Sequence, residues 1–154
     1  MPSERRSRTI AAPLGELWEL VRDPRQLARW WPRVTRVEGV HDDAFTQVMM
    51  SSKGKAVRAD FKLLRVDEGA HSLRWEQCVQ DTPFARLLKS ATTEVSLAPA
   101  RAEPPAPTAP ATEVTIEVHQ ALKGIFPRLG AHMVRRAAGA TIEDALDGLE
   151  RISG

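Results

Sequence analysis

The chain has 154 residues, of which 42% are hydrophobic and 27% are charged, and its formal net charge is +2. This length and composition are typical of one globular domain that buries a core without disulfides or metal. The small charge gives no indication of a nucleic-acid partner, and the single cysteine, Cys78, excludes an intramolecular disulfide.

The sequence also lacks the patterns of a metal-binding site and of a membrane-spanning or signal segment. The four histidines are scattered, without the spacing of metal ligands. No apolar run reaches membrane-spanning length, and the N-terminus lacks the apolar segment of a signal peptide. We therefore expect a cytoplasmic protein with no integral membrane association, no metal and no cofactor.

The first 32 residues predict a short strand followed by two short helices. Residues 8–11 are expected to form the strand. Pro13 opens a helix with apolar residues on one face, namely Leu14, Leu17, Trp18 and Val21. Asp23 and Pro24 form an N-cap with proline at the first helical position, and the second helix ends at Trp30-Trp31-Pro32.

A strand, two small helices and a Trp-Trp-Pro corner resemble the opening of the SRPBCC superfamily, the START-like ligand-binding domains. Within it, the pattern is most similar to the polyketide cyclase/dehydrase and lipid-transport branch. The resemblance implies a hydrophobic cavity and a small apolar ligand, and it does not name that ligand.

Period-two alternation predicts six further strands of an antiparallel sheet. We expect them at residues 33–40, 45–50, 56–66, 72–79, 84–97 and 113–119. A segment rich in proline and alanine, residues 98–111, separates the last two strands and is expected to be an extended, mobile hairpin loop. A domain boundary is not expected there, so residues 1–154 form a single domain.

Residues 126–152 have the pattern of a long helix. The face expected to point at the sheet has small residues at its centre, namely Gly130, Ala137, Thr141, Ala145 and Gly148. The predicted fold is α+β, a helix-grip fold in which a curved seven-stranded antiparallel sheet wraps around the C-terminal helix. Small residues facing a concave sheet either allow close packing or leave room for a guest, and the curvature favours a cavity.

The inward-facing residues of these elements are the candidate ligand-binding residues. They are Trp31, Phe61, Trp75, Gln77, Phe84, Thr93, Met133, Ala137 and Thr141. The Gln77 amide is expected either to form hydrogen bonds with neighbouring backbone groups or to be free to bind a polar group of a ligand. One of Trp30 and Trp31 is expected to fill the core and the other to lie at the cavity mouth, while Phe84 is placed to be a lid or a plug.

No catalytic constellation is recognisable. The sequence shows no Ser-His-Asp arrangement in a supporting motif, no glycine-rich phosphate loop, no defensible acid pair and no tyrosine. The leading hypothesis is binding of a small hydrophobic, lipid- or polyketide-like molecule between sheet and helix. One alternative is a polyketide cyclase/dehydrase-like enzyme using the same cavity, and another is a protein-interaction or co-chaperone-like module. The sequence leaves the ligand and the oligomeric state open.

Overall fold

The computed structural model describes residues 3–51, 53–80, 82, 85, 88–100, 110–122 and 129–153. Seven strands form one antiparallel sheet in the order β1-β7-β6-β5-β4-β3-β2. The strands are β1 (Ser3–Ile10), β2 (Val34–His41), β3 (Ala44–Met50), β4 (Ala56–Asp67), β5 (Ser72–Gln77), β6 (Leu88–Pro99) and β7 (Thr112–Leu122). The helices are α1 (Leu14–Arg22), the 3-10 turn η1 (Pro24–Gln26), α2 (Leu27–Trp30) and α3 (Leu129–Ser153).

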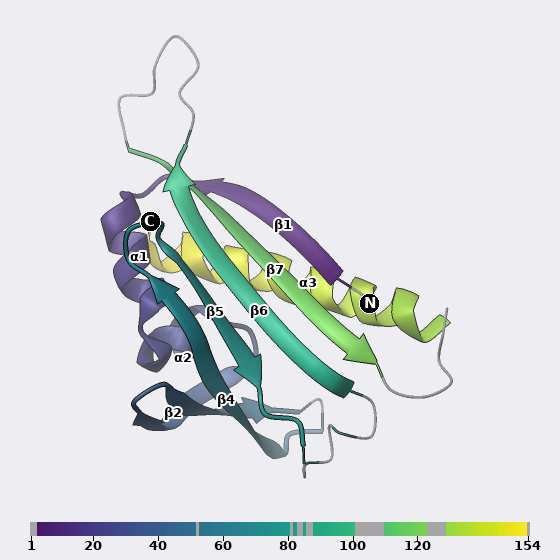
Figure 1. The fold of residues 1–154 in the computed structure, drawn as a ribbon. Helices are drawn as coiled ribbons and strands as arrows, with labels where there is room; N and C mark the ends of the chain where they lie inside the picture. The colour runs from purple at the N-terminus through teal and green to yellow at the C-terminus, as the bar shows by residue number, and fades with distance from the viewer. Residues whose placement is uncertain are drawn as a thin grey trace.

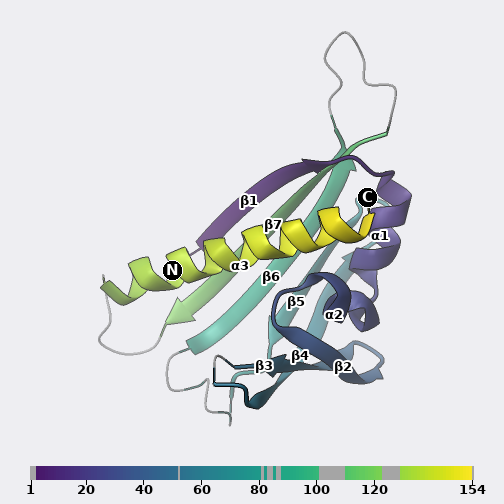
Figure 2. The same cartoon turned by 180° about the vertical axis from the view of Figure 1, so that it is seen from behind.

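The sheet curves around α3, as the sequence predicts. Figures 1 and 2 show α3 lying along one face of the sheet, with α1 and α2 at the end where α3 finishes. The opposite face of the sheet carries no helix in these views. The predicted helix-grip architecture is therefore confirmed.

The two short helices form for the reasons that the sequence indicates. Pro13 is the N-cap of α1, and this helix buries Leu17, Trp18 and Val21. The Asp23 side chain accepts a hydrogen bond of 3.0 Å from the backbone N–H of Arg25 at the start of η1. These caps fix the direction in which the chain reaches Trp30 and Trp31.

Strand β1 begins five residues earlier than predicted, at Ser3. Its first half is polar on both faces, so it has no alternation to detect. Pairing to β7 holds it, from Ser3 opposite His119 to Ile10 opposite Thr112. The strand thus depends on partners that are remote in the sequence.

The strands before and after the proline-rich segment form a hairpin. Pro99 is opposite Thr112, and the Ala100 N–H donates to the Ala111 carbonyl at 3.0 Å. Most of the predicted loop, residues 101–109, lies outside the described residues, as do residues 126–128 at the predicted start of the long helix.

The buried face of α3 is rotated from the predicted one. Ile142, Leu146 and Leu149 are fully buried, and none of them belongs to the five small residues predicted to face the sheet. The reason is that α3 packs against β1 and α2 as well as β7, so a stripe wider than the small residues is covered. Gly148 faces α2, where an added Cβ would lie only 2.3 Å from the Trp30 carbonyl oxygen.

Ion pairs join the outer side of α3 to β1. The Arg8 guanidinium donates to Asp147 at 2.5 Å and to Glu143 at 2.7 Å. The hydrogen bond to Asp147 is the main cause that raises the pKa of Arg8 above its ordinary value. The acidic second half of α3 therefore has a partner within the chain.

Candidate functional site

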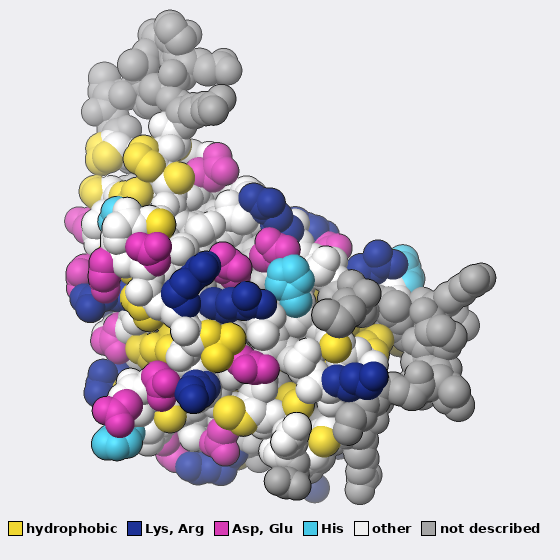
Figure 3. All heavy atoms as spheres, in the orientation of Figure 1, with side chains coloured by type: hydrophobic (Ala, Val, Ile, Leu, Met, Phe, Trp, Pro, Cys, Tyr) yellow, Lys and Arg dark blue, Asp and Glu magenta, His cyan; other side chains and the backbone are white. Residues whose placement is uncertain are grey.

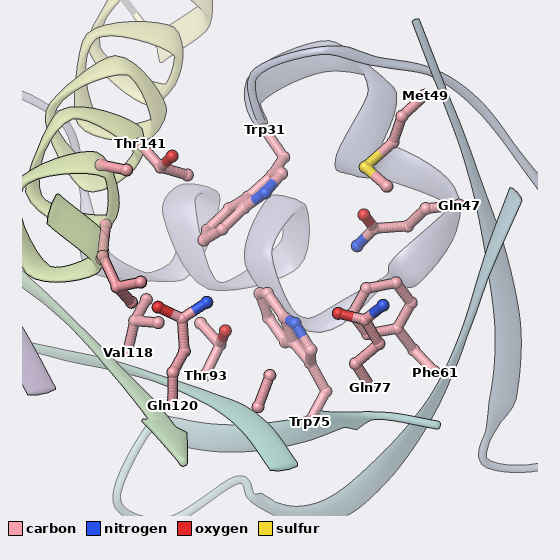
Figure 4. A pocket seen from close by; sticks show the side chains of 14 residues that line it. Trp31, Gln47, Met49, Phe61, Trp75, Gln77, Thr93, Val118, Gln120 and Thr141 are labelled. Atoms are coloured by element: carbon pink, nitrogen blue, oxygen red, sulfur yellow. The ribbon is translucent and has the colours of Figure 1, made fainter. Parts of the chain in front are cut away.

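A cavity of about 330 Å³ lies between the concave face of the sheet and α3. Strands β3 to β7 supply one wall, α3 supplies the opposite wall, and the residue after α2 closes part of the remaining side (Figure 4). Seven of the candidate residues lie on its wall, namely Trp31, Phe61, Trp75, Gln77, Thr93, Ala137 and Thr141. Ala137 is also exposed, so the cavity opens to solvent beside this part of α3.

The prediction that Met133 lines the cavity is wrong. Its side chain is 69% exposed and does not line the cavity. Because each helical residue turns by about 100°, the helix directs Val134 into the cavity and Met133 toward solvent. Four residues of α3 line the cavity, and their spacing places them on one face of the helix. They are Val134, Ala137, Ala138 and Thr141. Phe84 lies outside the described residues.

Seven further residues line the cavity, and four of them, Ala91, Val118, Val134 and Ala138, are apolar residues of β6, β7 and α3. Of the other three, Gln47 and Met49 come from β3, and Gln120 comes from β7. Each continues an alternation already visible in the sequence, from Phe45 in β3 and from Val118 in β7. A polar residue at an inward position breaks the apolar pattern on which the prediction relied, and this is why both glutamines were missed.

Three tryptophans form a chain of edge-to-face contacts. The ring centroids of Trp30 and Trp31 are 5.4 Å apart, and those of Trp31 and Trp75 are 5.3 Å apart. Trp30 is 2% exposed and belongs to the core, whereas Trp31 is half-buried and lines the cavity. Phe61 stacks on the buried Phe45 at 5.4 Å. The aromatic wall is consequently held from behind by other rings.

The polar groups of the cavity wall are uncharged. They are the amides of Gln47, Gln77 and Gln120 and the hydroxyls of Thr93 and Thr141. Figure 4 shows the three amide groups on the sheet side, facing the space in front of Trp31. No Asp, Glu, His, Lys or Arg belongs to the wall in the part of the chain that the structure describes.

Gln47 is the most deeply buried of these polar residues. It is 2% exposed, and its Nε2 has no hydrogen-bond partner among the described residues. A buried N–H group without a partner costs about 1–3 kcal/mol of stability. This donor is closed off from solvent and has no partner within the described chain.

Charged side chains gather instead on the outer face of the sheet, where both signs are interspersed (Figure 3). Arg65 donates to Glu94 at 3.1 Å, and Arg58 and Arg36 both donate to Glu38. The hydrogen bonds from Arg36 and Arg58 lower the pKa of Glu38. Over residues 3–153, with the gaps given above, no cluster of three His, Cys, Asp or Glu side chains could hold a metal ion.

Within the same described ranges, no helix is both long and apolar enough to cross a bilayer.

The whole chain, residues 1–154, matches the family model for polyketide cyclase/dehydrase and lipid transport. The chain belongs to this family. Among curated proteins no relative matches the chain.

Solved structures show the same fold at low sequence identity. The Zhui aromatase/cyclase from Streptomyces sp. R1128 is 13% identical with a TM-score of 0.74, over 98% of this chain and 92% of that one. A START superfamily protein from Mycobacterium smegmatis is 14% identical with a TM-score of 0.73, over 99% and 97% of the two chains. The di-domain ARO/CYC protein BexL of the BE-7585A biosynthetic pathway is 16% identical with a TM-score of 0.77, over 98% of this chain and 46% of that one. These likenesses establish the fold of this family member.

Proposed function

We propose that this family member binds a small, uncharged and largely apolar molecule, lipid- or polyketide-like, in the cavity between the sheet and α3. The observation that carries the proposal is the wall itself, which combines rigid aromatic rings with a few uncharged polar groups. Ligand sites are concave and mostly apolar, with few polar groups that fix orientation. The family's description, which includes lipid transport, supports the same class of ligand.

The chemistry of the wall favours binding over proton transfer. A general acid or base must exchange a proton near the working pH, and amide and threonine hydroxyl groups do not do so. The described wall contains only such groups besides its apolar residues. A cyclase that uses the cavity to fold a reactive chain is the second candidate, supported by the structural likeness to aromatase/cyclase proteins.

An interaction module with a filled core receives less support. Such a protein needs no hollow of about 330 Å³ lined by aromatic rings. The cavity and its opening beside Ala137 favour a small-molecule ligand over a macromolecular partner.

Filling the cavity tests the proposal. In Ala137→Phe the new ring enters the mouth from a residue that is both exposed and on the wall, so it meets little overpacking. We expect uptake of the apolar dye Nile red to fall at least tenfold, measured by fluorescence titration, while the melting temperature changes by only a few degrees.

Ala140→Phe is the matched control, because Ala140 is exposed on the same helix and does not line the cavity. This variant should take up the dye as the wild type does. Equal dye binding by Ala137→Phe and the wild type would contradict a binding site at this position.

A further inference from the structure

Two segments border the open side of the cavity, and both carry positive charge. Met49 near the end of β3 and Ala137 of α3 line the cavity, and each is at least partly exposed to solvent. Figure 4 shows Met49 on the side of the cavity across from α3. The chain around these two residues, 44–59 and 132–142, contains no Asp or Glu. The opening therefore lies between two stretches of chain without a negative side chain.

The cations of these stretches have no partner within the described chain. Four of them are exposed and form no ion pair among the described residues, namely Lys53, Lys55, Arg135 and Arg136. The two arginines have no acidic residue three or four positions away on α3, so no side-chain pair there stabilises the helix. Glu4 comes close to α3 at Gly139, but it is paired with Arg6.

Exposed methionines lie beside these cations. Met133 is 69% exposed, one helical turn before Ala137, and Met50 at the end of β3 is 44% exposed. The turn after Met50 is closed by the Ser51 N–H, which donates to the Lys55 carbonyl at 2.8 Å. This turn holds the two lysines next to Met50. A large apolar side chain in water gains free energy when it enters an apolar medium.

Cations beside protruding apolar side chains are typical of a surface that contacts an anionic bilayer. Lysine and arginine are attracted to the lipid headgroups, while the apolar side chains enter the boundary between headgroups and acyl chains. A helix or strand of an acidic protein would instead place its own apolar residues in a groove. Because Met133 protrudes and lines no groove, we favour the bilayer as the partner.

We propose that a basic rim, formed by Lys53, Lys55, Arg135 and Arg136 with Met50 and Met133, docks the open side of the cavity on a bilayer that contains anionic lipid. The contact is peripheral and depends on charge. The inference goes beyond the proposed function and rests on other residues, since none of these six lines the cavity. Docking brings the opening beside Ala137 against a medium in which apolar molecules dissolve.

Co-sedimentation with vesicles tests the inference. One set of vesicles is phosphatidylcholine alone, and the other contains phosphatidylcholine and phosphatidylglycerol in equal parts. At physiological salt the wild type should bind the anionic vesicles at least about tenfold more tightly, since each cation near the surface contributes about fivefold. Higher salt should weaken this binding.

Two variants divide the rim into its charged and apolar parts. Joint substitution of Arg135→Gln and Arg136→Gln should weaken binding to the anionic vesicles by at least about tenfold. Met133→Ser should weaken it by about threefold and keep the preference for anionic lipid, because less apolar area enters the bilayer.

The matched control joins Arg33→Gln with Arg151→Gln. Both are exposed, and they lie where the chain after α2 meets the C-terminal end of α3. This variant has the same net charge as the variant of Arg135 and Arg136. It should bind the anionic vesicles within about twofold of the wild type.

Three outcomes would overturn the inference. The wild type could bind both kinds of vesicle equally, or the control could lose as much binding as the variant of Arg135 and Arg136. The wild type could also bind neither vesicle while it binds polyglutamate through Arg135 and Arg136, and the rim would then meet an acidic protein. None of these results affects the proposed function, because Nile red uptake is measured without vesicles. A wild type that takes up no dye would overturn the proposed function and leave the vesicle result unchanged.

Discussion

The buried polar residues of this chain differ in whether their side chains have hydrogen-bond partners. Thr112 is fully buried, and its hydroxyl donates to the Ala12 carbonyl at 2.8 Å. The buried Gln47 nitrogen has no such partner among the described residues. A satisfied polar group supports the fold, whereas a buried unsatisfied one lowers the free energy of unfolding.

The single cysteine, Cys78, directly follows β5. It is exposed, and its backbone N–H donates to the Asp60 carbonyl at 2.8 Å. Partial burial, followed by the negative charges of Asp60 and Glu76, raises the pKa of the thiol. Both effects disfavour the thiolate, which is the nucleophilic form.

We predict that Cys78 reacts more slowly with a disulfide reagent at neutral pH than free cysteine does. Since the thiolate forms only at higher pH, the midpoint of the rate against pH should lie above the ordinary thiol value of about 8.5. Glu76→Gln removes one of the negative charges and should move this midpoint down. Glu113→Gln, an exposed carboxylate of β7, should leave it in place, and a midpoint below that of free cysteine would contradict the prediction.

At the residue scale, the sequence predicts the aromatic wall and part of its polar complement, namely Gln77, Thr93 and Thr141, but not Gln47 and Gln120. Trp75 and Gln77 follow from alternation in a strand with apolar neighbours on both sides. Gln47 shares its inward row with Phe45 and Met49, so the alternation was visible, but the tertiary structure decides whether that row lines a cavity. Met133 fails for a geometric reason, because one residue of error on a helix is a rotation of about 100°.

The elements of the fold are held together by close approaches as well as by apolar burial. α3 crosses α2 at Gly148, where a Cβ would lie 2.3 Å from the Trp30 oxygen and 3.0 Å from its carbonyl carbon. At Gly139 a Cβ would instead meet the end of a flexible side chain, the Arg6 guanidinium, at 2.9 Å. Gly139 and Gly148 of α3 therefore differ in what a methyl group would displace.

This difference predicts opposite effects of the same substitution. Gly148→Ala must push α2 away from α3, and we expect a loss of about 1–3 kcal/mol in the free energy of unfolding. Gly139→Ala requires only that Arg6 move, so the higher helix propensity of alanine, worth up to about 1 kcal/mol, should leave it neutral or stabilised. Urea denaturation of both variants measures these values. A Gly148→Ala protein as stable as the wild type would show that the helices do not depend on this contact.

Elements with a regular apolar period were predictable, and those held by remote partners were not. β5 and β7 alternate strictly and were found within two residues of most boundaries. The first half of β1 has no such period and exists through its pairing with β7. The rotation of α3 was missed because its buried stripe is set by β1, β7, α1 and α2 together rather than by the sheet alone.

At the scale of the whole molecule, charge and cavity are separated. Ion pairs cover the outer face of the sheet and the β1 side of α3. The cavity between them is lined, in the described part of the chain, by residues that carry no charge. Protonation changes thus occur outside the site, where solvent screens their effect on a neutral ligand.

The separation predicts that binding does not depend on pH and is not followed by turnover. The affinity for a neutral probe such as 9-fluorenone should stay constant within about twofold between about pH 5 and pH 9, because no wall residue of the described chain titrates there. Calorimetry at three pH values, each with a check of the melting temperature, measures this. A general acid or base in the cavity would give a different result, since its protonation would appear in the affinity or in a bell-shaped rate profile on a polyketide-like substrate. Such a profile would make the cyclase alternative the better account of this cavity, with the proton carried by a group outside the wall described here.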